Sequence, residues 1–150
     1  LAAYQDAGGT LGIGSDSHIS ISPVEELRWL EYGQRLTSGH RNVAARGQGV
    51  SVGETLWRAA LRGGAQAAGL ALGELREGAR ADLIVLDENS PLLAARDARS
   101  VLDSFLFAGN TPLVRDVMCG GDWVVRDFRH RDEERIAERY RETVSALAAL

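Results

Sequence analysis

The chain has 150 residues, of which 45% are hydrophobic, and its 17 Lys and Arg against 21 Asp and Glu give a formal net charge of −4. This acidic balance argues against a nucleic-acid-binding domain, and no apolar run approaches the roughly 18 residues that would indicate a membrane span. The single cysteine, Cys119, excludes an internal disulfide, so we expect a cytoplasmic protein.

The first residues predict the tail of a helix that stops at Gly8 and Gly9. Because the sequence has no initiator Met and no signal peptide, we expect it to be the end of a longer chain. Residues 11–14, Leu-Gly-Ile-Gly, form a short apolar run between glycines, which predicts a buried strand. The strand leads directly into four polar residues, Ser15, Asp16, Ser17 and His18.

Two helices follow, and each has the same signal at its start. Ser22-Pro23-Val24-Glu25 is a capping box and predicts a helix from Pro23 to about Leu36. Four apolar residues of this helix are candidates for burial: Val24, Leu27, Leu30 and Trp29. Ser51-Val52-Gly53-Glu54 opens a second helix, which we expect to break or kink at Gly63-Gly64.

From residue 72 the pattern changes to short strands. Residues 81–87 have the length of a buried strand, and residues 114–119 and 123–126 flank a glycine turn, as in a hairpin. Residues 100–107 predict one or two helical turns. Residues 132–150 predict a final amphipathic helix, whose apolar stripe consists of Ile136, Tyr140, Val144 and Leu147.

Asp16 is the candidate functional residue. A carboxylate at the carboxyl end of a buried strand, followed by a loop and a helix, is where parallel α/β folds place catalytic groups. Such a group could bind a metal ion or accept a proton from a metal-bound water. An Asp between two serines is also typical of a turn residue. His18 could be a second ligand or a substrate contact, or a loop histidine without a ligand.

The other polar residues have structural explanations. Glu25 belongs to the capping box, and Glu31 can pair with Arg28 or Arg35 along the helix surface. The two arginines could bind a substrate carboxylate, but a solvated helix face is the simpler expectation. His40 and His130 lie in polar surroundings and should be solvated, and Cys119, in a strand before a glycine turn, should be packed.

Several runs resemble a known family. The chain is similar to the formimidoylglutamate deiminases of bacterial histidine degradation, within the amidohydrolase superfamily. The likeness lies in residues 11–18, in the run Glu-Glu-Leu-Arg-Trp-Leu-Glu-Tyr-Gly-Gln at 25–34, and in residues 60–67, 78–87, 106–109, 114–118 and 123–127. The likeness covers nearly the whole chain. The run at 25–34 is the discriminating part, since the others recur across metal-dependent deaminases.

The resemblance implies an α/β fold, namely the C-terminal fragment of a metal-dependent hydrolase with a (β/α)8 TIM barrel and a small β-sandwich. Residues 1–72 would hold the last barrel strand and helices, 73–130 the sandwich segment, and 131–150 the C-terminal helix. A barrel takes about 250 residues, so the chain cannot contain a whole one. The family's metal-binding histidines have no counterpart here and would lie upstream.

The resemblance also implies a function for the complete protein. One divalent metal ion, zinc by family likeness, would activate water for hydrolysis of N-formimino-L-glutamate to N-formyl-L-glutamate and ammonia. Asp16 would bind the metal and carry the proton, and Ser17 and His18 would contact the substrate. We expect a small-molecule substrate, no nucleic-acid or membrane partner and no activity of the 150 residues alone; a homodimer stays open. A purine-type deaminase and a non-catalytic interaction module are the alternatives.

Overall fold

A computed structural model describes residues 1–17, 19–45 and 49–150 of the chain. These residues form two compact units, each described by itself. Unit 1 consists of Leu1–Arg80 and Asp87–Leu113, and unit 2 of Ala81–Leu86 and Val114–Leu150. None of the helices in the described part of the chain is long and apolar enough to cross a membrane.

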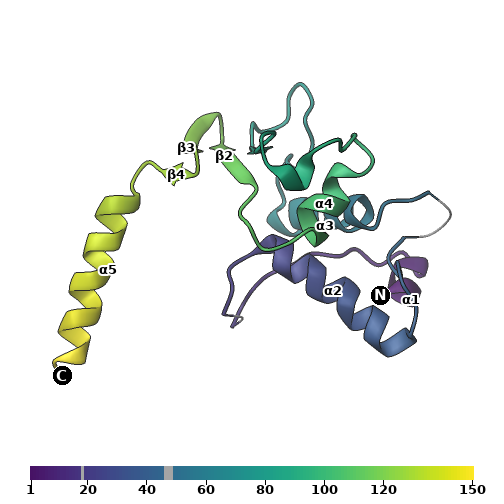
Figure 1. Cartoon of the computed structure of the whole chain (residues 1–150), viewed down its shortest axis with the longest axis horizontal. Helices are drawn as coiled ribbons and strands as arrows, with labels where there is room; N and C mark the ends of the chain where they lie inside the picture. Colours follow the sequence, from purple (N-terminus) through teal and green to yellow (C-terminus); the bar gives the residue numbers. More distant parts are fainter. Residues whose placement is uncertain (18, 46–48) are drawn as a thin grey trace. The chain divides into compact units, whose positions relative to one another are not determined.

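Unit 1 is helical. Its elements are α1 (Ala2–Asp6), α2 (Pro23–Ser38), α3 (Val52–Ala68), the 3-10 helix η1 (Pro91–Leu93) and α4 (Val101–Phe107). Both long helices, α2 and α3, pack against the short helix α4 (Figure 1). The core therefore forms around α4, where Leu27 of α2 and Leu56 of α3 are fully buried, as is Leu106 of α4 itself.

The predicted helix starts are confirmed. The Ser22 hydroxyl accepts a hydrogen bond from the Glu25 backbone N–H at 3.3 Å, and the Ser51 hydroxyl accepts one from the Glu54 N–H at 2.9 Å. Each helix ends at a glycine in the left-handed region, where a side chain would be strained. The helix α2 therefore continues two residues beyond the expected Leu36.

The expected break of α3 at Gly63-Gly64 is wrong, because the helix runs unbroken to Ala68. Gly63 is buried, and a Cβ atom built on it would lie only 1.8 Å from the Leu11 carbonyl oxygen. A helical glycine costs about 1 kcal/mol relative to alanine, and here it permits this backbone contact. Gly63 is thus a packing residue and not a helix breaker.

Two expectations for apolar segments of unit 1 also differ from the structure. Trp29, a candidate for burial, is 55% exposed, and its indole N–H donates to the Glu25 carboxylate at 3.4 Å. Residues 11–14 do not form the predicted strand. A strand needs a hydrogen-bonded neighbour, and all the strands in the described part of the chain belong to unit 2.

Glu31 of α2 is fully buried, so the expectation that it lies on the helix surface is wrong. The expected pairing with Arg35 is confirmed, with Arg35 Nε at 2.7 Å from Glu31 Oε1. The backbone N–H groups of Val43 and Ala44 each donate to the same carboxylate at 2.9 Å. A buried carboxylate with these donors fixes the loop after α2 to the helix.

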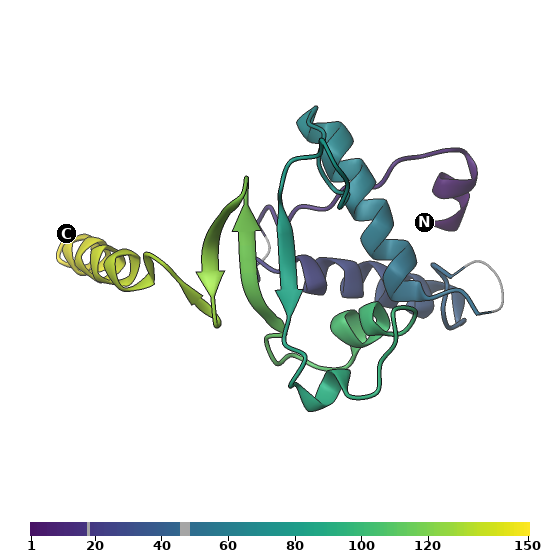
Figure 2. The same cartoon turned by 90° about the horizontal axis from the view of Figure 1, so that it is seen from above.

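Unit 2 is a four-stranded antiparallel sheet followed by a helix. Its strands lie in the order β1 (Leu83–Leu86), β2 (Val114–Cys119), β3 (Asp122–Arg126) and β4 (Arg129–His130). Figure 2 shows the first three as neighbouring arrows of alternating direction. The predicted hairpin of β2 and β3 is confirmed, and Gly120 and Gly121 both take the positive φ that its tight turn requires. The short strand β4 was not predicted.

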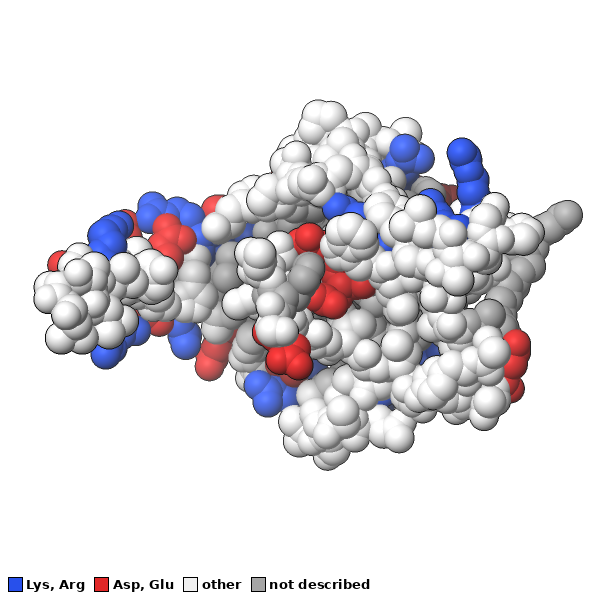
Figure 3. All heavy atoms as spheres, turned by 90° about the horizontal axis from the view of Figure 1, so that it is seen from below, with Lys and Arg blue, Asp and Glu red and all other residues white. Residues whose placement is uncertain are grey.

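The predicted C-terminal helix is confirmed as α5 (Glu133–Ala148). Its apolar stripe is present but remains uncovered, and each of its side chains is at least 44% exposed: Ile136, Tyr140, Val144 and Leu147. Figure 3 shows this helix at the left of the view, with Arg and acidic side chains along both sides of an uncharged face. The amphipathic pattern therefore describes the helix correctly without identifying what it packs against.

Asp116 is the buried charge of the sheet, at 5% exposure. Its carboxylate accepts a hydrogen bond from the Asp127 N–H at 2.9 Å and pairs with Arg115 at 3.0 Å. The Asp127 hydrogen bond, helped by Arg115 and Arg126 and opposed by burial, holds the pKa of Asp116 below its usual value of 3.8. The charged form of this carboxylate therefore stabilises the sheet.

We predict that Glu31→Gln lowers the free energy of unfolding by about 2–4 kcal/mol, because it removes the charge that Arg35 pairs with and leaves a buried donor unsatisfied. Urea unfolding followed by circular dichroism measures the loss. The matched control is Glu54→Gln, which breaks the exposed pair with Arg58 and should cost less than about 1 kcal/mol. Equal small losses in both variants would contradict the buried role.

We predict that the stabilisation by Asp116 depends on pH. Its folded-state pKa lies below the unfolded value, so the stabilisation is complete above that unfolded value and fades as the pH falls through the lowered one. Asp116→Asn should therefore be less stable than the parent chain at about pH 7, and this deficit should shrink as the pH falls towards about 2. Urea midpoints at both pH values test this, with Asp122→Asn in the exposed hairpin turn as the control. A deficit that stays constant with pH would contradict it.

Candidate functional site

Asp16 lies in an exposed turn with Ser17, after residues 11–15, which form neither helix nor strand. Its φ is +40°, a left-handed conformation that Asp tolerates better than most residues. No hydrogen bond or ion pair joins its carboxylate to another described residue, and the exposed position of Asp16 suits a group that meets a ligand. Ser17 is exposed beside it, whereas His18 lies outside the described residues.

The segment that carries Asp16 is held at its two ends and by packing. Before it, the Tyr4 hydroxyl donates to the Thr10 carbonyl oxygen at 2.9 Å; after it, Ser22 caps α2. Between these points, no hydrogen bond joins residues 11–21 to another described residue. The close approach of the Leu11 backbone to Gly63 of α3 is a contact that locates the start of the segment.

The described residues do not contain a complete metal site. No group of three or more His, Cys, Asp or Glu side chains lies close enough together, among the residues that the structure covers, to hold an ion. The exposed Asp16 carboxylate has the chemistry of a single ligand to a hard or borderline cation. Further ligands would have to come from outside the described set.

Arg28 does not lie on a solvated helix face, contrary to expectation. Its Nε donates to the Leu106 carbonyl oxygen at 2.7 Å, and another guanidinium nitrogen donates to the Gly109 carbonyl oxygen at 2.6 Å. A third bond goes to the side chain of Asn110. Each of its three nitrogens therefore makes a hydrogen bond to the end of α4 or to the turn after it, so Arg28 joins α2 to this part of unit 1.

Arg35 is also occupied, by Glu31 and by two aromatic rings. Its guanidinium carbon lies 5.4 Å from the ring centroids of both Tyr32 and Phe107, within the range of a cation–π contact. The two arginines that follow Asp16 most closely in the sequence thus serve packing. The sequence signal for Arg28 was absent, because its acceptors lie about 80 residues away.

The remaining sequence candidates each have a structural setting of their own. His40 is exposed, as expected. The expectation that His130 is simply solvated is wrong, because it is half-buried and its Nδ1 accepts a hydrogen bond from the Asp132 N–H at 3.1 Å. Cys119 is exposed and not packed, because it is the last residue before the hairpin turn.

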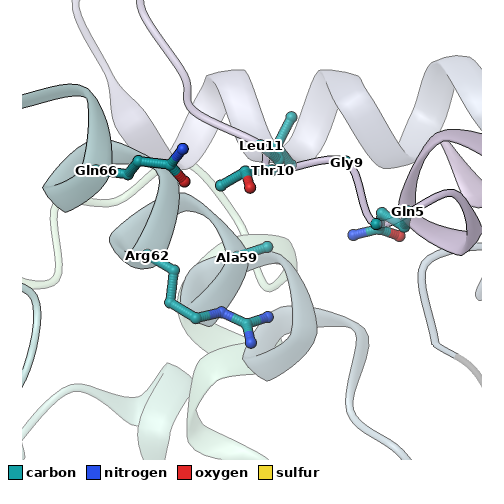
Figure 4. A pocket seen from close by; sticks show the side chains of 8 residues that line it. Gln5, Gly9, Thr10, Leu11, Ala59, Arg62 and Gln66 are labelled. Atoms are coloured by element: carbon teal, nitrogen blue, oxygen red, sulfur yellow. The ribbon is translucent and has the colours of Figure 1, made fainter.

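A pocket of about 380 Å³ lies in unit 1, next to the start of the Asp16 segment. Gly8 to Leu11 form one wall, and three side chains of α3 form the other: Ala59, Arg62 and Gln66. Figure 4 shows Thr10 and Leu11 alongside this helix, with the Gln5 side chain at the far end. The pocket contains no carboxylate and none of the predicted site residues.

Comparisons with known proteins agree with the sequence resemblance. The formimidoylglutamate deiminase of Pseudomonas aeruginosa is 55% identical over 140 residues, which cover 93% of this chain and 31% of that protein. A 5-methylthioadenosine/S-adenosylhomocysteine deaminase of Desulforamulus reducens is 29% identical over 155 residues, covering 99% of this chain and 34% of the relative. The chain thus spans about a third of the length of these curated relatives.

Solved structures give the same result for the fold. An amidohydrolase from Brucella melitensis superimposes with a TM-score of 0.86 at 37% identity, over 97% of this chain and 32% of that one. An adenosine deaminase from Xanthomonas campestris with bound zinc superimposes with a TM-score of 0.76 at 22% identity, over 99% of this chain and 33% of that one. The second likeness concerns the fold alone.

The sequence model of the amidohydrolase family matches residues 1–124, which include Asp16 and most of the sheet of unit 2. The predicted membership and the α/β character of the fold are therefore confirmed. This chain belongs to the amidohydrolase family.

Proposed function

We propose that this chain forms part of a metal-dependent deiminase that hydrolyses N-formimino-L-glutamate. Water adds to the formimino carbon, the C=N bond is replaced by C=O, and the products are N-formyl-L-glutamate and ammonia. The observation that carries the proposal is the 55% identity over 140 residues to a formimidoylglutamate deiminase. The relatives that act on 5-methylthioadenosine or S-adenosylhomocysteine, by their names, reach at most 29%.

In this proposal Asp16 has two tasks. Its exposed carboxylate would be one ligand of a divalent metal ion, for which zinc is the candidate because a structural neighbour binds it. A bound zinc ion acts as a Lewis acid and brings the pKa of a water ligand towards neutrality. Asp16 would accept the proton of that water and release it to the leaving nitrogen. Ser17 and His18 remain proposed contacts to the substrate.

The proposal places the other metal ligands outside this chain. A zinc site uses several His, Cys or acidic ligands, and the described residues contain no such group. The relatives are about three times as long, which leaves room for those ligands. The 150 residues alone should therefore have no deiminase activity. The small-molecule substrate, the homodimer and the cytoplasmic location are proposals for the complete protein.

The substrate has two carboxylates, and the proposal assigns neither of them to Arg28 or Arg35. Each nitrogen of Arg28 donates to the end of α4 or to the turn after it, and Arg35 is paired with the buried Glu31. Withdrawing either guanidinium would leave buried or half-buried acceptors unpaired. We therefore infer that the substrate carboxylates are recognised by cations other than these two arginines.

A chimera tests the proposed substrate. We would replace the segment of the Pseudomonas aeruginosa enzyme that aligns with this chain by the chain itself, and measure zinc-dependent ammonia release. We expect turnover of N-formimino-L-glutamate by the chimera and none by the isolated 150 residues. A folded chimera that acts only on adenosine or S-adenosylhomocysteine would overturn the substrate. A folded chimera without any turnover would indicate a non-catalytic module.

We predict that Asp16→Asn in this chimera lowers kcat by about 10²–10⁴-fold, since the amide can neither carry the proton nor bind the metal as a charged ligand. Steady-state ammonia release measures the loss. Asp122→Asn, at an exposed position of the hairpin in unit 2, is the matched control and should leave kcat unchanged. Retention of kcat within a few-fold in Asp16→Asn would show that Asp16 is only a turn residue.

A further inference from the structure

At Gly63, the helix α3 meets the backbone of the segment that leads to Asp16. Four of its residues form a buried stripe at helical spacing: Val52, Leu56, Ala59 and Gly63. At Gly63 an ideal Cβ atom would lie 1.8 Å from the Leu11 carbonyl oxygen, 2.3 Å from the Leu11 carbonyl carbon and 2.8 Å from the Gly12 nitrogen. All three atoms are backbone, so no side-chain rotation could relieve the clash.

The segment rather than the helix would have to move. The other end of α3 is fixed at Gly53, whose Cβ position is 2.4 Å from the Leu102 carbonyl oxygen and whose N–H donates to the Asp103 carboxylate at 2.7 Å. Residues 11–21, by contrast, are not held by hydrogen bonds among the described residues. A methyl group at Gly63 would therefore push Leu11 away by roughly 1.5 Å, to reach an ordinary contact of 3.4 Å or more.

Such a shift would be passed on to Asp16. Only four residues separate Leu11 from Asp16, a span of less than about 18 Å even when the chain is extended. Beyond Asp16, the next hydrogen-bonded position among the described residues is Ser22, which caps α2. A misplacement of about 1 Å in a reacting group can cost about 10²-fold in rate.

We infer that Gly63 is a positioning residue of the proposed site: its missing side chain lets α3 set the distance at which the Leu11 backbone lies, and thereby the place of the Asp16 carboxylate. This inference rests on the proposed function, in which Asp16 takes part in the reaction.

The adjacent glycine provides a matched control. Gly64 lies in the same helix, but a Cβ atom there would meet nothing within 4 Å. Gly63→Ala and Gly64→Ala therefore make the same change in helix propensity, and they differ only in the contact with Leu11. We would introduce each into the chimera and measure kcat, KM and the folded fraction at the assay temperature.

In Gly63→Ala we expect kcat to fall at least about tenfold, with KM within about twofold, because the proton carrier is displaced while substrate binding is kept. A loss of folded fraction alone would appear in the folded fraction measured at the same temperature. Gly64→Ala should keep the parent kcat and melt at an equal or higher temperature. A folded Gly63→Ala with parent kcat would overturn the inference.

A crystal structure of each variant gives a readout that needs no activity. We expect residues 11–16 to move by at least about 1 Å relative to α3 in Gly63→Ala and to stay in place in Gly64→Ala; an unmoved segment in Gly63→Ala would overturn the inference. If the parent chimera is inactive, the proposed function fails while this comparison still decides the displacement. If Gly63→Ala does not fold, the double variant Leu11→Gly/Gly63→Ala takes its place, and the single variant Leu11→Gly is its reference. A glycine at position 11 lets the carbonyl group of that residue turn away from the new methyl group.

Discussion

The close approach of backbone to backbone at two glycines of α3 determines the arrangement of unit 1. Gly53 admits the start of α4, and Gly63, ten residues and about 15 Å further along the helix, admits the segment that leads to Asp16. Side chains can rotate to accommodate a change, but packed backbone cannot. Contacts with α3 therefore fix both the position of α4 and that of the segment leading to the candidate site.

Hydrogen bonds extend this arrangement to α2. Arg28 reaches from α2 to the backbone that ends α4, and Glu31, one turn later, fixes the loop that leads towards α3. Both side chains bind other parts of unit 1. The run of residues 25–34, which distinguishes the formimidoylglutamate deiminases in the sequence, thus contains two side chains whose visible task is to hold the unit together.

The sequence predicted those features whose causes are local. The caps at Ser22 and Ser51 and the hairpin turn at Gly120-Gly121 depend on residues within a few positions, and all were found. The errors arose where a distant segment decides. The glycine pair predicts a break at Gly63 because the contact of Gly63 with Leu11, 52 positions away, is not visible in the local sequence. The apolar run predicts a strand at residues 11–14 because it does not reveal whether a neighbouring strand is there to pair with.

The candidate site follows the same division. Asp16 could be singled out from its place between an apolar run and a capped helix, and the structure describes it as an exposed carboxylate without a partner among the described residues. Neither the pattern nor the described part of the chain supplies the set of ligands that a metal ion needs. A catalytic carboxylate acquires its function from groups brought to it by the fold, and those groups are not encoded next to it.

All 17 cationic side chains of the chain are arginines. An arginine keeps its charge over the pH range in which proteins stay folded, so the ion pair between Arg115 and Asp116 is not lost in alkali. Acid can neutralise the Asp116 carboxylate, whose pKa lies below its usual value. The tolerance of this ion pair to pH should therefore be one-sided: alkaline media leave it intact, and acid dissociates it.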